Sequence, residues 1–523
     1  LFAIVVGAAG LVVAGQALSR QLLALRADRP ALAAMGLDRR QLRRAAVLRA
    51  ALLVSAGSVL ALVVAVALSP LFPLGVAERA EIDPGVDVDL VVLLPGIGLF
   101  AGTLLLWCAV RARAIAGSPG TTRATGRTGR GERLATSLSN PIASTGLRAA
   151  IAGGATRRTG SAGAALGGLS LAVAAVAATV TFGANIDRLV STPNEYGWSW
   201  DAMVTLPSEQ WHTPGEEIVR RFDARPEITG WSVMTLDQTT LDGERIPAVG
   251  IESGRGDVGL EIIDGRSPAG DDEVALGGRT MELLDVGIGD QVRAGQRSLE
   301  VVGQAVFPGV GTYPGADRTE LGKGALLTRS AIEDVGEGFG FENLIVDAAD
   351  EAGLTAALDA VLADQQAALE NEEIEVHSEP ALPADVLSLR EVRSTPLVIA
   401  GVLALLGGAA FAVVLVSGVR ARRREIAVLK TFGFRSRDVA GTVAWQATVT
   451  AVLAAVVGIS LGTVLGRSAW SVLADVLGVA GDARVPGTLL AVFAGVLVAA
   501  NLLAVGPGVV AARTRPATML RAE

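Results

Sequence analysis

The chain has 523 residues, of which 50% are hydrophobic and 19% are charged, with a formal net charge of −8 and a mean hydropathy of +0.47. This composition excludes an ordinary soluble protein of such length, because the core helices of soluble proteins rarely run far without a charged residue.

Seven long runs contain no charged residue, and each has 19 to 28 residues. Because about 20 apolar residues in a helix cross the core of a bilayer, each run is predicted to be a transmembrane helix. In chain order the runs are Leu1–Ser19, Ala50–Ala77, Leu90–Val110, Thr159–Ile186, Ser394–Val419, Val439–Gly466 and Val485–Ala512.

The first run, Leu1–Ser19, lacks the pattern of a signal peptide. It has no basic start, and no small-residue cleavage site follows it. The chain also begins without a methionine. We therefore expect Leu1 to lie inside a longer natural protein.

Charge is divided unevenly along the chain. Residues 187–393 carry 40 acidic and 15 basic residues, a net of −25, whereas the rest of the chain has a net of +17. The basic residues gather at 20–49, 111–158 and 420–437 and in the C-terminal tail. By the positive-inside rule these segments are cytoplasmic. The prediction is a multi-pass protein of the cell membrane, with residues 187–393 outside and the C-terminus in the cytoplasm.

The two ends of the chain resemble each other. Ala31–Leu37 reads ALAAMGL and Val428–Phe434 reads VLKTFGF, and each is followed by a charged segment and a long apolar run. A shift of 397 residues aligns Gly36 with Gly433. Chance similarity between Ala/Val-rich helices is the alternative, but the shared part is the polar segment. Both copies run in the same direction, so two parallel repeats are predicted rather than inverted ones.

The sequence between the repeats predicts a linker and an inserted domain. The linker begins with the Gly/Thr/Arg-rich stretch GSPGTTRATGRTGRGER and ends with a short amphipathic helix on the inner membrane surface, within Asn140–Arg158. The predicted division is a three-helix block at 1–112, the linker at 113–158, a transmembrane helix at 159–186, an extracytoplasmic α+β domain at 187–393 and a second three-helix block at 394–523.

Strand and helix patterns alternate within residues 187–393. Cys108 is the only cysteine, so this domain has no disulfide. Residues 256–340 are rich in Gly, Val and turns, and predict a small β-rich subdomain. The other predicted elements are strand Asp201–Leu206, helix Pro214–Phe222, a hairpin of Thr229–Leu236 and Arg245–Ile251 through Asp242–Gly243, strand Glu342–Val346, helix Leu354–Leu369 and strand Glu373–His377.

Several kinds of functional site are missing from the sequence. The only Gly-Lys pair, Gly322–Lys323, is followed by Gly324 and not by the Ser or Thr of a phosphate-binding loop. The two histidines, His212 and His377, do not have metal-ligand spacing. We therefore expect no enzyme activity, no metal and no cofactor in this chain, and no nucleic-acid partner.

The apolar runs contain no Asp, Glu, Lys, Arg or His. Ion-coupled carriers place such residues inside the membrane, so a secondary carrier is disfavoured. The many small residues in the runs indicate either close helix packing or a general Ala/Gly bias. Trp198 and Trp200 follow the fourth run, and anchoring at the membrane interface is preferred over ligand stacking.

The segment Arg422–Phe434, RRREIAVLKTFGF, is the most specific signal in the sequence. It predicts a short amphipathic helix closed by Gly433 as a C-terminal cap. The alternative, a basic run that binds anionic lipid, accounts for the arginines but not for the helix. The apolar face would hold Ile426, Leu429 and Lys430, and the wet face Arg423, Arg424 and Glu425.

This segment resembles the coupling helix of the FtsX/MacB-type permeases of ABC transporters. Their pattern is basic-Arg-Glu-Ile-x-x-Leu-basic-x-x-Gly, directly after the helix that follows the external domain. The resemblance extends to the order of the helices and covers nearly the whole chain. The matching residues here are Arg423, Arg424, Glu425, Ile426, Leu429, Lys430 and Gly433.

The resemblance implies two ATPase subunits as partners, with ATP and magnesium bound on them, and coupling helices at about 27–37 and 424–434. The first copy departs from the pattern, because Asp28-Arg29-Pro30 stands where the second copy has Glu425-Ile426-Ala427. It also lacks an opening helix and an external domain, which either precede Leu1 or have been lost. The implied coupling residues are Pro30, Leu32, Met35, Gly36, Leu37, Arg424, Glu425, Ile426, Leu429, Lys430, Gly433 and Phe434.

The expected function is that of a permease subunit that couples ATP hydrolysis to movement of the external domain, for export or extraction of a lipoprotein, peptide or drug. The alternative is a regulatory membrane scaffold that transports nothing, for example one that controls a cell-wall hydrolase. The lipid bilayer and an extracytoplasmic protein or lipoprotein are the further partners implied.

Overall fold

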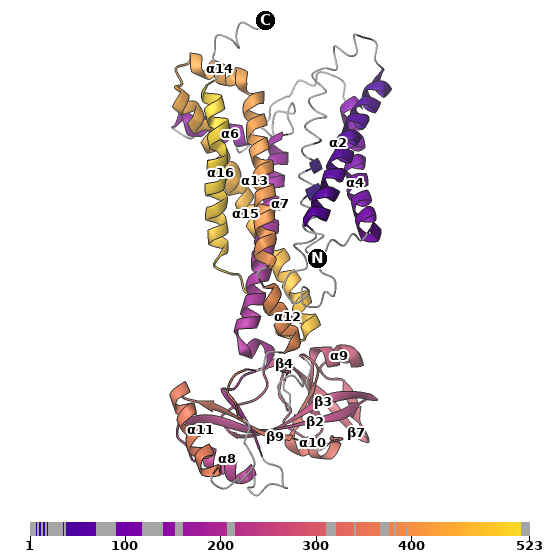
Figure 1. Cartoon of the computed structure of the whole chain (residues 1–523), viewed down its shortest axis with the longest axis vertical. Helices are drawn as coiled ribbons and strands as arrows, with labels where there is room; N and C mark the ends of the chain where they lie inside the picture. The colour runs from indigo at the N-terminus through magenta and orange to yellow at the C-terminus, as the bar shows by residue number, and fades with distance from the viewer. Residues whose placement is uncertain are drawn as a thin grey trace. The chain divides into compact units, whose positions relative to one another are not determined.

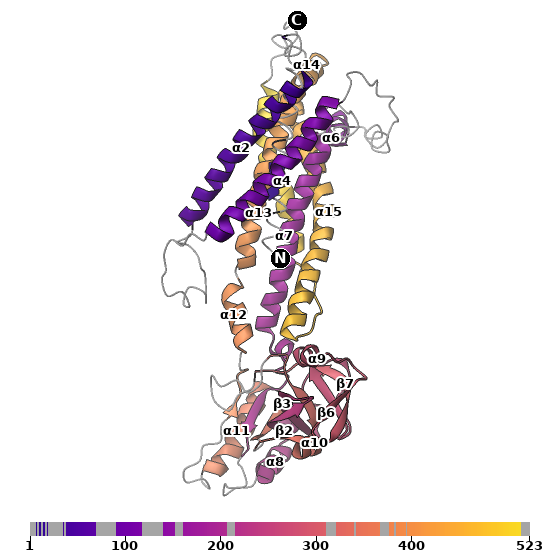
Figure 2. The same cartoon turned by 90° about the vertical axis from the view of Figure 1, so that its right-hand side faces the viewer.

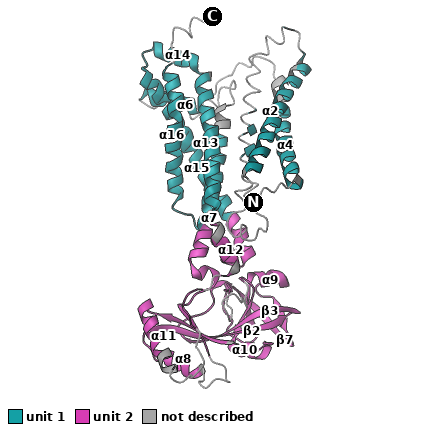
Figure 3. Ribbon diagram, in the orientation of Figure 1, with its two compact units in different colours: residues 1–184, 394–468, 484–523 teal, residues 185–393, 469–483 magenta. Residues whose placement is uncertain are grey.

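The chain divides into two compact units, which are coloured separately in Figure 3. The first consists of Leu1–Ala184, Ser394–Ser468 and Arg484–Glu523, and the second of Asn185–Arg393 and Ala469–Ala483. The computed structural model describes residues 7, 10, 11, 14, 15, 18, 35, 38–68, 90–117, 140–151, 161–206, 215–309, 321–338, 341–366, 376–380, 383–393 and 395–513.

Six helices in the described residues are long and apolar enough to cross a membrane (Figure 1). They match six of the seven predicted runs, and the remaining run, Leu1–Ser19, lies mostly outside the described residues. The six helices are α2 (Arg39–Leu68), α4 (Leu90–Gly117), α7 (Ser161–Ser191), α13 (Thr395–Ala421), α15 (Ser436–Leu477) and α16 (Leu489–Ala512).

Glycines at every fourth position bring α15 against α7, and Figure 2 shows the two helices side by side. A Cβ atom added to Gly458 would lie 2.6 Å from the Ser170 carbonyl oxygen. One added to Gly462 would lie 2.4 Å from the Ala174 carbonyl oxygen. Gly466 repeats this approach one turn further along. The small residues here therefore serve close helix packing, which is one of the two readings left open by the sequence.

Two short helices also lie in the described part of the first unit. Helix α6 (Pro141–Ile151) lies within the predicted amphipathic segment, and Asn140 caps it by accepting a hydrogen bond of 2.9 Å from the Ile142 N–H. It packs on α15, where Gly441 faces the Ile142 side chain. Helix α14 (Arg423–Thr431) joins α13 to α15.

The second unit is built on one ten-stranded sheet with the order β10-β1-β9-β2-β3-β8-β5-β7-β4, and β6 pairs with β2 and β7. Strands β3 and β8, and β5 and β7, are parallel, so the sheet is mixed. The strands are β1 (Ala202–Thr205), β2 (Ile228–Leu241), β3 (Glu244–Arg255), β4 (Ile262–Gly265), β5 (Glu273–Gly277), β6 (Gln291–Ala294), β7 (Arg297–Ala305), β8 (Ala325–Thr328), β9 (Phe341–Ala348) and β10 (Val376–His377).

Two hydrophobic cores lie against this sheet. One packs α8 (Gly215–Asp223) and α11 (Glu351–Gln366) on β1, β2 and β9. The other joins β3, β5, β7 and β8 with α10 (Arg329–Val335) and with α9 (Gly278–Leu284), which packs at its edge. The unit also contains η2 (Pro193–Tyr196) and α12 (Ala384–Val392).

The predicted elements of this domain agree with the observed ones in type and order. The hairpin β2–β3 turns at Asp242 and Gly243, whose φ values of 47° and 91° are those of a two-residue hairpin loop. Pro214, the first residue predicted for α8, lies outside the described residues.

Two features of this unit add to the predicted division of the chain. The strands of residues 256–340 continue the main sheet, because β8 pairs with β3 and connects β4, β5 and β7 to it. Helices α9 and α10 also belong to this β-rich insertion. The unit further takes in Ala469–Ala483, which the sequence division assigns to the second three-helix block.

The predicted membrane-interface position of Trp198 and Trp200 is wrong. The two side chains are 2% and 4% exposed, and their ring centroids are 5.1 Å apart. Between them, the Ser199 hydroxyl donates a hydrogen bond of 2.5 Å to the Gly259 carbonyl. The tryptophans are therefore part of the interior of the second unit, because the chain after η2 turns inward before it enters β1.

Candidate coupling site

Helix α14 ends in the cap that the sequence predicts. The Gly433 N–H donates to the Lys430 carbonyl at 3.1 Å, and the Phe434 N–H donates to the Leu429 carbonyl at 3.2 Å. Gly433 has a φ of 98°, which a residue without a side chain adopts most easily. This paired arrangement satisfies carbonyls at the helix end and turns the chain toward α15.

One face of α14 packs on the membrane helices. Ile426 is 8% exposed and Ala427 is fully buried. Ile426 belongs to a core built from α13, α15 and α16, against which Phe434 also packs. The Ile426 side chain therefore holds α14 to its own helix bundle instead of facing outward.

Lys430 and Leu429, two further predicted coupling residues, also face the helix bundle. The Lys430 ammonium donates a hydrogen bond of 2.6 Å to the Ala512 carbonyl, at the last residue of α16, and Ser436 donates to the same oxygen. The partial negative charge at the C-terminal end of α16 also stabilises the Lys430 cation at this position. Leu429 is half-buried.

The outward face of α14 contains both charged and apolar side chains. Arg424 and Glu425 are exposed, and so is Val428 on the next turn. Phe432, the residue before the capping glycine, is 81% exposed. The coupling residues predicted from the sequence did not include Val428 and Phe432. The position of Phe432, immediately before the Gly433 cap, could have identified it as an exposed residue.

The first repeat has the same arrangement at its one described coupling position. Met35 aligns with Phe432 under the shift of 397 residues and is 69% exposed. The predicted coupling residues Pro30, Leu32, Gly36 and Leu37 lie outside the described residues. Both repeats thus expose a large apolar side chain immediately before the aligned glycine.

Helix α6 reaches the start of α14. Arg422 donates a hydrogen bond of 3.1 Å from its guanidinium to the Ala149 carbonyl near the C-terminal end of α6. At Gly146 a Cβ atom would lie 2.6 Å from the Trp445 side chain, so α6 rests closely on α15. The corner between α13 and α14 is therefore tied to the linker helix as well as to the bundle.

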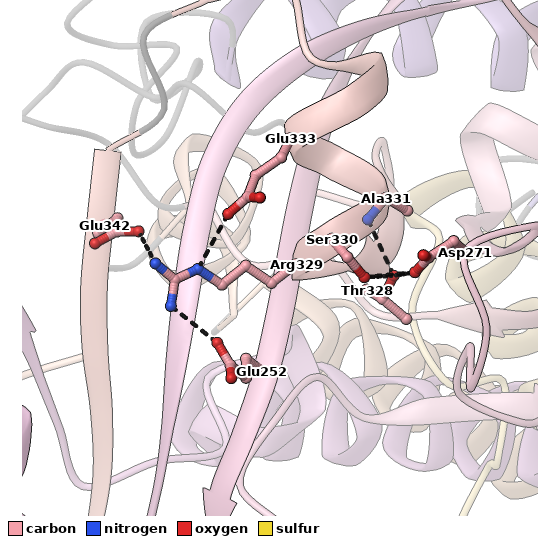
Figure 4. Close-up of polar contacts among 8 residues, drawn as sticks. All are labelled: Glu252, Asp271, Thr328, Arg329, Ser330, Ala331, Glu333 and Glu342. Atoms are coloured by element: carbon pink, nitrogen blue, oxygen red, sulfur yellow. Dashed lines mark hydrogen bonds and ion pairs between the residues drawn. The ribbon is translucent and has the colours of Figure 1, made fainter. Parts of the chain in front are cut away.

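The external unit contains a polar cluster at the start of α10, shown in Figure 4. Arg329 donates to Glu252 at 2.8 Å and to Glu342 at 2.5 Å, and lies 3.6 Å from Glu333. Arg329 thus joins β3, β9 and α10. This polar cluster is explained by its structural role in connecting the three elements.

Asp271 lies beside this cluster and accepts hydrogen bonds from Ser330 and Thr328, which lower the pKa of its carboxyl. Among the described residues, no group of three or more His, Cys, Asp or Glu side chains is placed to hold a metal ion. His377 lies on β10, and His212 is outside the described part of the chain.

Comparisons with known proteins bear on the two three-helix blocks. Residues 1–115 and 397–516 both match the family described as FtsX-like permease C-terminal. No curated protein sequence matches the chain.

Two solved structures resemble part of the chain. The extracellular domain of the noncanonic ABC-type transporter YknZ from Gram-positive bacteria is 16% identical, with a TM-score of 0.25, over 34% of this chain and 98% of that one. The periplasmic region of MacB from Actinobacillus actinomycetemcomitans is 11% identical, also with a TM-score of 0.25, over 36% of this chain and 93% of that one.

The family match agrees with the features of both repeats. Each matched stretch contains an exposed apolar residue before a glycine and a helix that begins directly afterwards. The predicted resemblance to the FtsX/MacB-type permeases is therefore confirmed, together with the predicted fold class of a helical membrane protein with an inserted extracytoplasmic domain. The two three-helix blocks, at residues 1–115 and 397–516, are thus both similar to the FtsX-like permease family.

Proposed function

We propose that this chain couples ATP hydrolysis by a separate ATPase to movement of its external domain, and that the outward face of α14 is where that ATPase binds. The observation that carries the proposal is Phe432, an 81% exposed aromatic residue at the end of the helix that exposes Arg424 and Glu425. Aromatic and arginine side chains supply much of the energy of protein interfaces.

Helix α14 is suited to pass on a push from such a partner. Ile426 packs it on a core shared by α13, α15 and α16, and Lys430 binds the last carbonyl of α16. A displacement of α14 would therefore move three membrane helices together, since a packed core transmits strain.

Two ATPase copies, each with bound ATP and magnesium, would engage the two repeats. Met35 in the first repeat would have the role that Phe432 has in the second, because both are exposed at aligned positions. The C-terminus would then be cytoplasmic, and residues 187–393 would be the extracytoplasmic end that expels or extracts a lipoprotein, peptide or drug.

The proposal is tested by purifying the chain with ABC ATPase subunits from the same organism. Phe432→Asp is expected to reduce co-purification about tenfold, which corresponds to about 1.4 kcal/mol of binding free energy. Glu425→Arg should also lower the stimulation of ATP hydrolysis, because it reverses a charge on the same face.

Arg437→Ala is the matched control. Its side chain is 76% exposed but lies on α15, beyond the Gly433 cap, so the substitution should leave binding unchanged. If both α14 variants bind and stimulate the ATPase as the unaltered chain does, α14 is not the coupling helix. If no ATPase binds at all, a regulatory scaffold becomes the better explanation.

A further inference from the structure

The turn that ends α15 lies inside the external unit, although it belongs to the second three-helix block in sequence. The Gly478 N–H donates to the Asp475 carbonyl at 3.2 Å, and the Val479 N–H donates to the Ala474 carbonyl at 3.0 Å. With Gly478 at a φ of 69°, this is the same glycine cap that closes α14. The cap brings the chain out of the helix at one defined place.

At that place the turn meets the β-rich insertion, backbone against backbone. A Cβ atom on Gly478 would lie 2.6 Å from the Gly322 Cα, and one on Gly322 would lie 2.5 Å from the Leu477 carbonyl oxygen. Gly322, at a φ of 71°, is itself held in the insertion, because its carbonyl accepts a hydrogen bond of 3.0 Å from the Arg279 N–H. Only glycines on both sides permit this approach.

The contact is buried and is supported from the side. Leu477, Val479 and Leu321 are all buried around the two glycines. Further along the same turn, Arg188 at the end of α7 donates a hydrogen bond of 3.3 Å to the Asp482 carbonyl. The turn is therefore buried at Leu477–Val479 and is held at two points, Gly478 and Asp482.

We propose that the Gly322–Gly478 contact is a non-covalent route by which the second three-helix block acts on the β-rich insertion. This inference rests on the proposed coupling function. The external domain is joined covalently to the membrane helices only through its two chain ends, so this contact adds a connection that the chain path does not require. Helix α15 begins at Ser436, a few residues after α14, and runs to Leu477.

The helix itself is suited to carry a displacement. It has 42 residues, contains no proline, and at about 1.5 Å per residue measures about 63 Å. Gly458, Gly462 and Gly466 lock it closely against α7. A shift at its first turn would therefore arrive at Gly478, and from there at Gly322, without passing through α12.

The test uses the full chain with its partner ATPase in lipid nanodiscs, with hydrogen exchange followed by mass spectrometry, with and without ATP and vanadate. Gly322→Ala places a methyl group against the Leu477 carbonyl. Gly295→Ala is the matched control, because Gly295 has a φ of 60° in the same insertion but nothing within 4 Å of the added carbon.

In the unaltered chain and in Gly295→Ala, trapping with vanadate should change exchange in residues 321–328 and 474–483. In Gly322→Ala the change in 321–328 should be lost, while ATP hydrolysis and ATPase binding persist. Arg188→Ala, which releases the other end of the turn without adding volume, should act in the same direction and guards against a folding defect in the first variant.

The inference is overturned if Gly322→Ala keeps the full exchange response while the ATPase binds, or if Gly295→Ala loses the response equally. In either case the coupling function itself would stand. If no ATPase binds the unaltered chain, the proposed function fails and the inference fails with it.

Discussion

Asp38 and Arg435 are 397 residues apart and make the same hydrogen bond at the start of a membrane helix. The Asp38 N–H donates to the Gln41 side chain at 2.9 Å, and the Arg435 N–H donates to the Asp438 side chain at 2.8 Å. The donors and the acceptors both align under the shift that aligns Gly36 with Gly433. The two repeats therefore share the hydrogen bond that caps α2 and α15, in addition to their similar sequences.

The glycine cap of α14 predicts a cost for a side chain at Gly433. Gly433→Ala should destabilise the turn by about 1 kcal/mol, because an L-residue is strained at positive φ. Gly418→Ala, in the interior of α13, should instead be stabilising by up to about 1 kcal/mol. Neither added carbon has a neighbour within 4 Å. The difference between the unfolding temperatures of the two variants should therefore come from backbone conformation and not from packing. Equal shifts in the same direction would contradict this account.

The contact between α15 and α7 predicts that Gly462 does not tolerate a side chain. Gly462→Ala places a methyl group 2.6 Å from the Ala177 Cβ and should cost about 1–3 kcal/mol by overpacking. Gly401→Ala, at an open position on α13, is the control and should cost nothing. Unfolding in detergent followed by circular dichroism measures both. A Gly462→Ala chain as stable as the unaltered one would show that the two helices separate easily.

Asp347 predicts a stability that changes with pH. Burial, and then the nearby Asp201 carboxylate, raise the pKa of its carboxyl. The folded state therefore binds this proton more tightly than the unfolded state, so stability is highest at low pH and falls as pH rises from about 3.8 through the folded pKa.

Asp347→Asn should for that reason raise the unfolding temperature of the external domain at pH 7 and lose this advantage below about pH 3.8. Asp257→Asn, at an exposed position, is the control. Tryptophan fluorescence reports the transition, because Trp198 and Trp200 are buried in this domain. An Asp347→Asn chain that unfolds at the unaltered temperature at pH 7 would rule out the proposed destabilisation.

Glu273 predicts the opposite dependence. Hydrogen bonds from Arg266, and then from the Ala269 N–H, lower the pKa of its carboxyl to about 2. The stability it contributes is present above about pH 4.5 and is lost as the pH falls toward about 2. Glu273→Gln should unfold at a lower temperature than the unaltered chain at pH 7. The difference between the two unfolding temperatures should shrink as the pH falls toward about 2. Because the pair lies at the surface, high salt should shrink the difference.

Local patterns in the sequence determined the membrane helices, the Asp242–Gly243 hairpin and the Gly433 cap. Each depends on residues within one turn or one helix: uncharged length, a dipeptide that accepts positive φ, a glycine after an amphipathic stretch. The caps at Asp38 and Arg435 belong to the same class, since donor and acceptor are three residues apart.

The outward face of α14 and the connections of the external domain were decided by tertiary structure. Helical spacing groups Ile426 with Leu429 and Lys430, but only the neighbouring helices α13, α15 and α16 make that face the buried one and leave Phe432 outside. Pairing of β8 with β3, burial of Trp198 and the meeting of Gly322 with Gly478 likewise join segments far apart in the chain. Local periodicity carries no information about which distant surface a residue meets, and so these features follow from packing alone.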